Sequence, residues 1–475
     1  MTSEQRVVVI GGGLAGLRLA ARLGGAAAVT VLGEESHVPY NRVLLAEVLA
    51  GRYAPEVTAL PAVGPALRRG VRAVRVDRAD RTVHCDDGAA LPYDALVLAT
   101  GSNAVLPPLR GLFEPEGREL PDGVHAFRTM DDCLALSAAV GPGVRSVVIG
   151  GGLLGVSAAR ALAARGAQVV LAQQGERLME RQLDADASAL LATHLTALGV
   201  EIHTECRVRG LTTSAAPLPG LRPGPRASNA GGADVAPGET GFASGGDGLA
   251  LRAIQPHPTD GSSHNPAPPA IEERGLGRSP SSGAAHRHRT VTGVELADGY
   301  RLDADIVVLA CGVRPRTGLA QAAGLKTRTG IVVDDHLRTS DPRIHAIGDC
   351  AEHAGQVYGL AGPALEQADA LAATLAGRPT PYTGTRALTR LTLPGADGSL
   401  DLAAFGETTP LPGDDVVRLA DATRRTYRKV VVRGDRLVGG VLLGELSTVG
   451  ALARTWEGDE TPHDLFHLLT DDGGH

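Results

Sequence analysis

The sequence predicts an α/β protein with two parallel-sheet domains and a small C-terminal α+β domain. Three observations lead to this prediction. A buried strand, a glycine-rich turn, a helix and a second strand follow one another at residues 6–35, and the same order returns at residues 146–172. Beyond Pro379, alternating polar and apolar segments favour antiparallel strands instead, with a hairpin through Gly434 and Asp435.

The first unit has the glycine spacing of a dinucleotide-binding turn. Val7 to Ile10 form an apolar run that is typical of a strand buried on both faces. The pattern G-x-G-x-x-G follows at Gly11, Gly13 and Gly16. The first glycine of such a turn permits a sharp change of direction, the second lets a pyrophosphate approach the backbone, and the third lets the helix pack closely on its strand. Because strand and helix flank the glycines in the required order, we predict nucleotide binding here.

The residues after this turn complete the predicted site. Leu14 and Ala15 open the helix, whose unpaired N–H groups and dipole favour an anion. A second strand, Val29 to Leu32, ends just before Glu34 and Glu35. An acid at this position accepts hydrogen bonds from ribose hydroxyls, so both are candidate binding residues.

A second turn of the same kind follows a strand at Ser146 to Ile149. Gly150, Gly152 and Gly155 repeat the G-x-G-x-x-G spacing, and the helix is expected to run to about Ala164. Two such units imply two dinucleotide sites in separate domains, a combination much more specific than either turn alone.

The second site lacks the expected acid. Leu153 and Leu154 open its helix, and the next strand, Ala167 to Ala172, is followed by Gln173. Gln can hydrogen-bond a ribose hydroxyl, but it does not repel the 2′-phosphate of NADPH. With Arg177 nearby, the sequence leaves both NADH and NADPH open.

Further candidates lie in a turn and at three predicted strand ends. Arg42 precedes a helical segment at Val43 to Ala50, where it is a candidate contact for a phosphate or a flavin. Small residues allow a strand end to approach a bound nucleotide closely. The candidates at strand ends are Thr100 and Gly101, then Gly312, and finally Gly348 with Asp349.

Composition excludes several classes of function. The 475 residues are enough for two or three domains, each with its own core. The formal net charge of −7 provides no basic field for nucleic acid or anionic membrane, and aromatic residues, at 3%, are too few for a base-stacking platform. The N-terminal segment has no apolar signal region, and no apolar run is long enough to span a bilayer. We therefore expect a soluble, cytoplasmic protein that binds neither nucleic acid nor membrane.

The cysteines give no sign of a metal site or a disulfide. None of the five makes C-x-x-C or C-x₄-C spacing, so we expect no zinc site, no cysteine-ligated cluster and no metal ligand. They are predicted to be small buried residues. The five are Cys85, Cys133, Cys206, Cys311 and Cys350.

One long segment differs from the rest of the chain. From about Leu211 to Arg289, Gly, Pro, Ser, Ala and Asn dominate and apolar periodicity vanishes. We predict a disordered surface insertion there. His286 and His288 lie in a basic tract of this segment and are assigned no chemistry.

Seven motifs resemble those of one known family. They are V-I-G-G-G-L-A-G, E-E-x-x-x-P-Y-N-R, L-V-L-A-T-G, V-I-G-G-G-L-L-G, A-C-G-V-R-P, L-R-T-S-D-P-R-I-H-A-I-G-D-C and P-A-L-E-Q-A. With them the chain resembles those pyridine nucleotide–disulfide oxidoreductases that lack the disulfide, such as ferredoxin, rubredoxin and putidaredoxin reductases. It most resembles the flavoprotein region of assimilatory NAD(P)H-nitrite reductase large subunits. The resemblance covers nearly the whole chain outside the insertion.

The resemblance implies two Rossmann-like, three-layer dinucleotide-binding domains and a smaller third domain. The FAD-binding domain would comprise residues 1–120 and 315–378, and the NAD(P)-binding domain would comprise residues 121–314, with the insertion at 211–289. Residues 379–475 would form the C-terminal α+β domain, which would cover the flavin and help to form the surface for an electron acceptor.

The resemblance also implies roles for individual residues. The first glycine turn would hold the FAD pyrophosphate, and the second would hold NAD(P)H. The other implied FAD contacts are Glu34 at the adenosine ribose, Arg42 and Arg128 close to the cofactor, the backbone of Ala73 or Val74 at the adenine, Asp349 at the ribityl chain or pyrophosphate, and Ala364 and Leu365, which would bring a helix N-terminus toward the flavin.

The chain departs from the family at one pair of charges. Family members often carry a Glu two residues after the last glycine of the second turn, where this chain has Ser157. Many also carry a Lys after the P-Y-x-R segment, where this chain has Glu47 or a neighbour of it. We therefore expect both halves of an ion pair beside the flavin to be absent. Losing both avoids leaving one buried charge without a partner.

The resemblance implies an FAD-dependent NAD(P)H oxidoreductase that passes electrons to a separate protein. The acceptor would be a ferredoxin, a rubredoxin or a component of nitrite or nitrate reductase. Because the cofactors carry this chemistry, no catalytic residue is named. Full-length nitrite reductase large subunits continue into cysteine-rich iron–sulfur and sirohaem regions, so this chain by itself is not expected to reduce nitrite.

Two alternatives remain open from the sequence. One is an NAD(P)H oxidase or peroxidase, which usually needs a reactive cysteine beside the flavin. The other is a binding module that uses FAD and NAD(P)H to switch an interaction surface. The missing Lys/Glu pair and Gln173 favour this second alternative.

Overall fold

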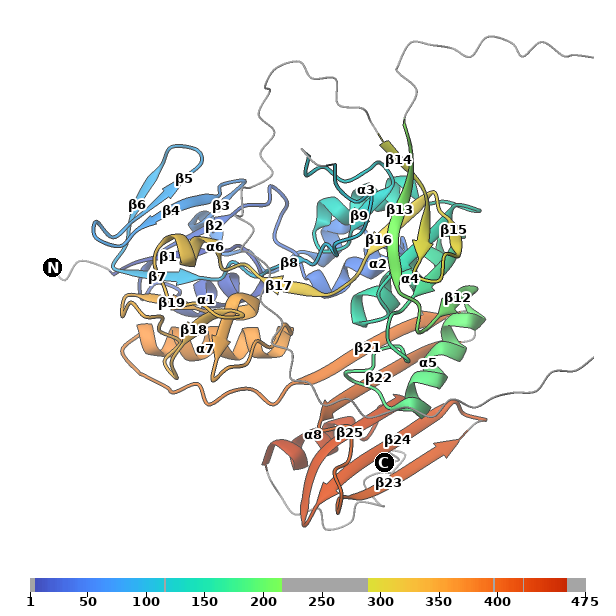
Figure 1. Cartoon of the computed structure of the whole chain (residues 1–475). Coiled ribbons are helices and arrows are strands. Elements are labelled where there is room, and N and C mark those ends of the chain that lie inside the picture. Colours follow the sequence, from blue (N-terminus) through green and yellow to red (C-terminus); the bar gives the residue numbers. More distant parts are fainter. Residues whose placement is uncertain (1–4, 115–116, 216–288, 396–397, 422, 459–475) are drawn as a thin grey trace, which may run out of the picture. The chain divides into compact units, whose positions relative to one another are not determined.

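The computed structural model describes residues 5–114, 117–215, 289–395, 398–421 and 423–458 (Figure 1). It confirms the α/β class, with two parallel sheets and a C-terminal antiparallel sheet. Within the described residues, no helix is both long enough and apolar enough to cross a bilayer.

The first parallel sheet is built around β1 (Arg6–Ile10), in the order β19-β7-β1-β2-β3. The last four residues of β1 are buried. Because β1 has parallel neighbours on both sides, its sequence is a continuous apolar run without polar alternation. The other strands are β2 (Ala28–Gly33), β3 (Leu67–Arg69), β7 (Ala95–Leu98) and β19 (Ile344–Ala346).

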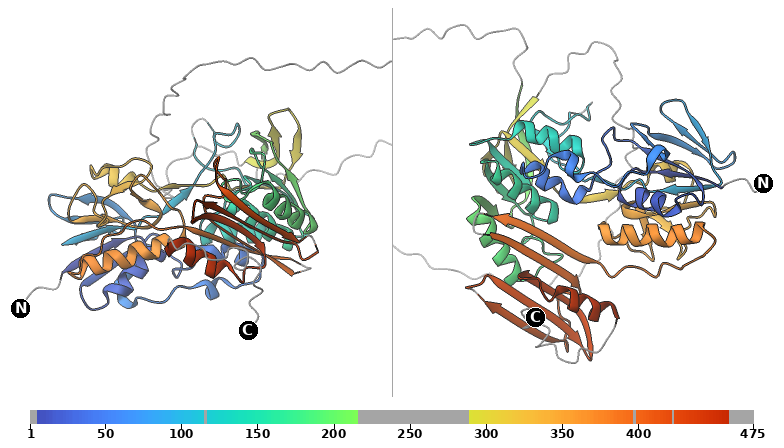
Figure 2. Two further views of the ribbon diagram at one scale, coloured as in Figure 1. Left: turned by 90° about the horizontal axis from the view of Figure 1, so that it is seen from below. Right: turned by 180° about the vertical axis from the view of Figure 1, so that it is seen from behind.

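Two helices far apart in the sequence lie side by side against this sheet (Figure 2). They are α1 (Leu14–Leu23) and α7 (Ala361–Leu375). Arg18 and Arg22 of α1 pair with Asp369 of α7 at 2.7 and 2.9 Å. Hydrogen bonds from the guanidinium groups lower the pKa of the Asp369 carboxyl to about 2, and the bond from Arg18 has a larger effect than that from Arg22.

The second parallel sheet has the order β12-β11-β10-β16-β9 and repeats the plan of the first. Its central strand, β10 (Arg145–Ile149), leads through the second glycine turn into α4 (Leu153–Ala164). The other strands are β9 (Val124–Ala126), β11 (Gln168–Ala172), β12 (Val200–His203) and β16 (Ile306–Leu309), and the other helices are α3 (Met130–Ala139) and α5 (Ala185–Ala197).

Short elements connect the two sheets or extend from them. β8 (Ser102–Ala104) pairs with β17 (Val313–Pro315) where the chain passes between the sheets. The three-stranded sheets are β4 (Ala73–Asp77) with β5 (Thr82–Cys85) and β6 (Ala90–Pro92), and β13 (Val208–Ala215) with β14 (Arg289–Leu296) and β15 (Arg301–Asp303). The remaining elements are η1 (Arg42–Leu44), α2 (Leu45–Leu49), η2 (Pro55–Thr58), η3 (Gly64–Ala66), α6 (Gly318–Ala322), β18 (Ile331–Val333), η4 (Gly348–Cys350) and β20 (Ala351–His353).

The C-terminal sheet is antiparallel, in the order β21-β22-β25-β24-β23. A helix, α8 (Val449–Gly458), packs on β25 and places Trp456 against Phe405, with 5.1 Å between the ring centroids. The strands are β21 (Leu388–Gly395), β22 (Gly398–Gly406), β23 (Asp415–Asp421), β24 (Thr426–Arg433) and β25 (Arg436–Gly444).

Most of the expected elements are present, with changed boundaries at a few. The hairpin through Gly434 and Asp435 is confirmed. The helical segment at 43–50 divides into η1 and α2. The insertion was expected to begin at Leu211, but β13 continues to Ala215 because it pairs with β14 on the far side of the segment. The rest of the insertion, residues 216–288, lies outside the described residues.

Candidate functional site

The first glycine turn leaves open space where a phosphate would bind. Gly11 has φ +130°, and a Cβ there would collide with the Ala99 carbonyl. A Cβ on Gly16 would collide with the Gly11 carbonyl. A Cβ on Gly13 would meet nothing within 4 Å, and this residue caps α1 without a side-chain hydrogen bond. The N-terminus of α1 is therefore accessible to an anion, as FAD requires of this turn.

The two acids after β2 have different environments. Glu34 Oε2 accepts a hydrogen bond from Arg316 Nη2 at 2.6 Å, and both side chains are partly exposed. Glu35 is enclosed by its own loop, where it pairs with Arg42 and accepts from Tyr40 Oη at 2.7 Å. Burial raises the pKa of Tyr40, and the opposing effect of the Arg42 charge is smaller. Glu34 is thus partly exposed and bonded to a distant segment, while Glu35 bonds residues of its own loop.

A charged network joins four segments that are distant in sequence. Arg42 Nη1 donates to the Arg128 carbonyl at 2.9 Å. Arg128 Nη2 donates to Asp349 Oδ2 at 2.6 Å and to Ser102 Oγ at 2.7 Å. Ser102 Oγ in turn donates to Asp349 Oδ2 at 2.8 Å. The structure therefore brings together the predicted residues Arg42, Arg128 and Asp349. It adds Ser102, whose only signal in the sequence is its place after a strand end.

The segment that carries Asp349 lies against the first glycine turn. Gly348 has φ +74°, and a Cβ there would lie 3.2 Å from Ala15 Cβ and 3.9 Å from Ala364 Cβ. Its N–H donates to Gln367 Oε1 at 2.8 Å. The N-terminus of α7 has no side-chain cap. Ala15, Gly348 and Ala364 therefore lie next to one another, with Leu365 next in the helix and Gln367 as a further residue that sequence reasoning missed.

The remaining predicted residues on the FAD side lie at a strand end and in β4. Thr100 Oγ1 donates to the Arg316 carbonyl at 2.8 Å, and the Arg316 N–H donates to the Gly101 carbonyl at 2.9 Å. Ala73 and Val74 begin β4, outside the parallel sheet, and Val74 is half exposed.

The second glycine turn repeats the geometry of the first. Gly150 has φ +109°, and a Cβ there would lie 2.5 Å from the Ala310 carbonyl oxygen. A Cβ on Gly155 would collide with the Gly150 carbonyl, whereas one on Gly152 would meet nothing within 4 Å. Gly312, at φ +98°, also faces open space. A second pyrophosphate thus fits at the N-terminus of α4, near Leu153 and Leu154.

Gln173 turns its carbonyl toward this second turn. Its Oε1 accepts a hydrogen bond from the Gly151 N–H at 2.7 Å. The side-chain amide N–H groups consequently face away from Gly151, so Gln173 is oriented as a donor.

Glu47 is paired through a residue that the sequence analysis did not single out. Arg160 Nη2 donates to Glu47 Oε1 at 2.6 Å, and Arg160 is only 2% exposed. Ser157 does not take part, because its Oγ donates to the Leu153 carbonyl at 2.8 Å. A buried carboxylate requires a cation, and Arg160, one turn beyond Ser157, supplies it. In this chain the acid therefore lies on α2 and the base on α4, the reverse of the pattern that the resemblance implied.

The cysteines show no feature of a reactive thiol. All five are free, and Cys85, Cys133 and Cys350 are buried, while Cys206 and Cys311 are partly buried. Burial raises the pKa of the Cys311 and Cys350 thiols. Within the described part of the chain, no three His, Cys, Asp or Glu side chains form a group that could hold a metal ion.

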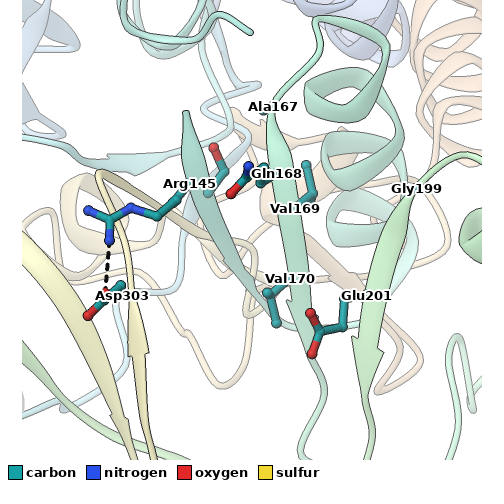
Figure 3. A pocket seen from close by; sticks show the side chains of 9 residues that line it. Arg145, Ala167, Gln168, Val169, Val170, Gly199, Glu201 and Asp303 are labelled. Atoms are coloured by element: carbon teal, nitrogen blue, oxygen red, sulfur yellow. Dashed lines mark hydrogen bonds and ion pairs between the residues drawn. The ribbon is translucent and has the colours of Figure 1, made fainter. Parts of the chain in front are cut away.

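An open pocket of about 440 Å³ lies elsewhere on the second sheet (Figure 3). Arg145, Gln168 and Glu201, at the amino ends of their strands, line it, and Arg145 Nη1 lies 2.9 Å from Asp303 Oδ2. Ligands of parallel α/β sheets bind at the opposite, carboxyl ends, where the glycine turns lie. This pocket is therefore not the dinucleotide site.

Comparison with known families assigns almost the whole described chain. The model for pyridine nucleotide-disulphide oxidoreductases matches residues 5–218 and 276–368. The model for the rubredoxin NAD⁺ reductase C-terminal domain matches residues 398–457.

Individual relatives agree with this assignment. The chain is 30% identical over 455 residues to nitrite reductase [NAD(P)H] of Bacillus subtilis (strain 168), covering 94% of this chain and 46% of the relative. It is 28% identical to putidaredoxin reductase CamA of Pseudomonas putida, covering 80% and 76%. The chain thus spans about half the length of the nitrite reductase. Among solved structures, the ferredoxin reductase for the CYP199A2 system of Rhodopseudomonas palustris matches with a TM-score of 0.72 and 24% identity, covering 98% and 99% of the two chains, which shows the same fold.

Proposed function

The chain belongs to the pyridine nucleotide-disulphide oxidoreductase family, whose members use FAD and NAD(P)H, and from this premise we propose that it passes electrons from NAD(P)H through FAD to a separate protein acceptor. The observation that carries the proposal is the pair of glycine turns, each with an open position at its second glycine and an uncapped helix N-terminus. One turn would serve the resident FAD and the other the nicotinamide donor.

Two parts of the first site would bind FAD. The turn at Gly13 would hold the pyrophosphate, and Glu34 would accept from the adenosine ribose. Bound flavin supplies the step between a two-electron hydride donor and a one-electron acceptor. The protein binds and orients the cofactor, and no residue needs to act as a general acid or base.

The ion pair between Arg128 and Asp349 explains how a carboxylate is tolerated near a pyrophosphate. Each side chain is 18% exposed, and their atoms lie 2.6 Å apart. The guanidinium neutralises the carboxylate, which removes most of the repulsion toward a bound phosphate, while the second oxygen of Asp349 stays available to accept from a hydroxyl. Ser102 fixes the orientation of the same carboxylate.

A protein acceptor agrees better with these residues than an oxygen species does. A flavin-linked peroxidase needs a thiolate, and burial raises the pKa of the Cys350 and Cys311 thiols near the cofactor ends of the sheets. The C-terminal match to the rubredoxin reductase domain also favours a small electron-transfer protein. We propose a ferredoxin, a rubredoxin or a component of nitrite or nitrate reductase as the acceptor.

The test has two half-reactions. Purified yellow protein is mixed anaerobically with NADH, and separately with NADPH, while the absorbance of the flavin at about 450 nm is followed. Fast bleaching by one or both nucleotides, followed by recovery when an oxidised ferredoxin or rubredoxin is added, is the expected result. Bleached protein that recovers only with O₂ or peroxide would identify an oxidase instead. Yellow protein that neither nucleotide bleaches would refute the reductase proposal.

A further inference from the structure

The loop after β11 folds back over the second glycine turn. The Met179 N–H donates to the Gly151 carbonyl at 2.9 Å, and Met179 is 2% exposed with φ +49°. A Cβ on Gly151 would lie 2.7 Å from Leu178 Cδ2. The N–H groups of Gln182 and Leu183 donate to the Met179 carbonyl at 2.8 and 2.9 Å. A left-handed conformation at a non-glycine residue persists only where packing determines it, so the residue that follows has a fixed place.

That residue is Glu180, and its carboxylate lies beside the end of β11. A Cβ on Gly175 would collide with Glu180 Oε2 and would lie 2.9 Å from Gln173 Nε2. The amide of Gln173 and the carboxylate of Glu180 therefore face the same small space, which exists because residue 175 is glycine. Among the described residues, Glu180 has no ion-pair or hydrogen-bond partner, and its side chain is exposed.

Gln173 alone is poorly suited to a ribose diol. Its Oε1 is directed at the Gly151 N–H, which leaves mainly its N–H groups for a ligand. A hydroxyl pair binds best when it donates to a carboxylate, and Glu180 offers one at this position.

The charges around this space are also unfavourable for a phosphate. Three acids belong to the surrounding loops, since Glu176 and Glu180 flank Gly175 and the Glu205 N–H donates to the Gly175 carbonyl at 2.9 Å. The cations of the same two loops are Arg177, whose Nη1 lies 3.6 Å from Glu176 Oε2, Arg181 and Arg207. A 2′-phosphate would add about two negative charges beside the Glu180 carboxylate, which no cation of the described residues pairs with.

We propose that Glu180 supplies the acid that the end of β11 lacks, so that it accepts from the adenosine ribose of NADH and disfavours the 2′-phosphate of NADPH. This inference rests on the proposed use of NAD(P)H and adds to it the choice between the two nucleotides. Gln173 then acts beside Glu180 as a donor to a ribose oxygen.

The experiment measures binding without turnover. ADP-ribose and 2′-phospho-ADP-ribose are titrated into the FAD-loaded protein by calorimetry, and NADH and NADPH are compared in anaerobic flavin reduction. The wild-type protein is expected to bind ADP-ribose at least tenfold more tightly, about the contribution of one hydrogen bond to a charged group. In Glu180→Gln that preference is expected to fall roughly tenfold. Glu201→Gln, at the amino end of its strand with a 65% exposed side chain, is the matched control and should keep the wild-type ratio.

Two results would overturn the inference while leaving the reductase proposal intact. One is an unchanged affinity ratio in Glu180→Gln, with a melting temperature that shows intact protein. The other is a wild-type preference for the phosphorylated ligand that disappears in Arg177→Met, which would assign the 2′-phosphate to Arg177. If neither ligand binds and neither nucleotide reduces the flavin, the proposed function fails as well.

Discussion

Arg160 of α4 and Glu47 of α2 form a buried ion pair, with 2.6 Å between Nη2 and Oε1. It joins the helix that starts at the second glycine turn to the short helix that follows Arg42 on the FAD side. Arg160 also has an Nε without a partner among the described residues, and burial lowers the pKa of its guanidinium. The charge of Arg160 is therefore stabilised mainly by Glu47, and that of Glu47 mainly by Arg160.

Removing one member of this pair should cost more than removing both. Arg160→Met leaves Glu47 buried without its principal cation, and we expect a loss of about 3–5 kcal/mol in apparent unfolding free energy, measured in urea. The double variant Arg160→Met with Glu47→Leu should recover most of this loss. Arg52→Met is the control, because Arg52 lies 3.5 Å from Glu47 with 47% of its side chain exposed, and should cost less than about 1 kcal/mol. A double variant no more stable than Arg160→Met would contradict this view of the pair.

The sequence predicted both glycine turns because their geometry is local. Gly16 packs against the Gly11 carbonyl of its own strand–turn–helix unit, and the G-x-G-x-x-G spacing encodes that contact directly, whereas the approach of Gly11 to Ala99 depends on a distant strand. The same applies to the hairpin at Gly434, where the turn residues and the alternation lie in one short stretch.

The side-chain partners of the site could not be predicted in the same way. Ser102 and Asp349 are 247 positions apart, and Glu34 and Arg316 are 282 positions apart. Their pairing depends on the path by which the chain returns from the second sheet to the first. Neither periodicity nor motif spacing predicts that path. The pairing of Arg160 with Glu47 was missed for the same reason. In the sequence Arg160 resembles an ordinary exposed helical charge, and only the structure shows that it is buried.

Two glycines of the first turn should respond differently to the same substitution. In Gly13→Ala the new methyl meets no protein atom within 4 Å but occupies the side from which a pyrophosphate approaches. We expect an apoprotein with an almost unchanged melting temperature and roughly tenfold or greater weakening of FAD binding, measured by quenching of flavin fluorescence. Gly16→Ala serves as the contrasting variant, because its methyl collides with the Gly11 carbonyl and should destabilise the apoprotein itself. Normal FAD affinity in Gly13→Ala would place the pyrophosphate elsewhere.

His345 should make stability depend on pH in mildly acidic solution. It lies in β19, is 4% exposed, and burial lowers its pKa to about 4. In the unfolded chain this histidine binds a proton near pH 6.5, whereas in the folded chain it does so only near about pH 4. The free energy of unfolding therefore falls as the pH decreases between these values, by up to about 3 kcal/mol. His345→Leu should flatten this part of the profile of urea midpoint against pH, whereas His203→Gln, on β12, should not. Equal slopes for the wild type and His345→Leu would show that other groups cause the loss.

Lys429 should attach the C-terminal sheet to α5 through Asp184. Its Nζ donates to Asp184 Oδ2 at 2.7 Å and to the Thr408 carbonyl at 2.8 Å, and Lys429 is 1% exposed. The same Asp184 oxygen accepts from Tyr427 Oη at 2.7 Å, while the other oxygen caps α5 through the Ala187 N–H. Lys429→Met leaves this carboxylate with a neutral hydroxyl and a backbone amide only, so we expect about 3–5 kcal/mol of lost stability, located by faster hydrogen exchange at the N-terminus of α5 and along β24. Tyr427→Phe keeps the cation and should lose only about 1 kcal/mol. If exchange increases equally across the first parallel sheet, the contact is not the local attachment that its geometry indicates.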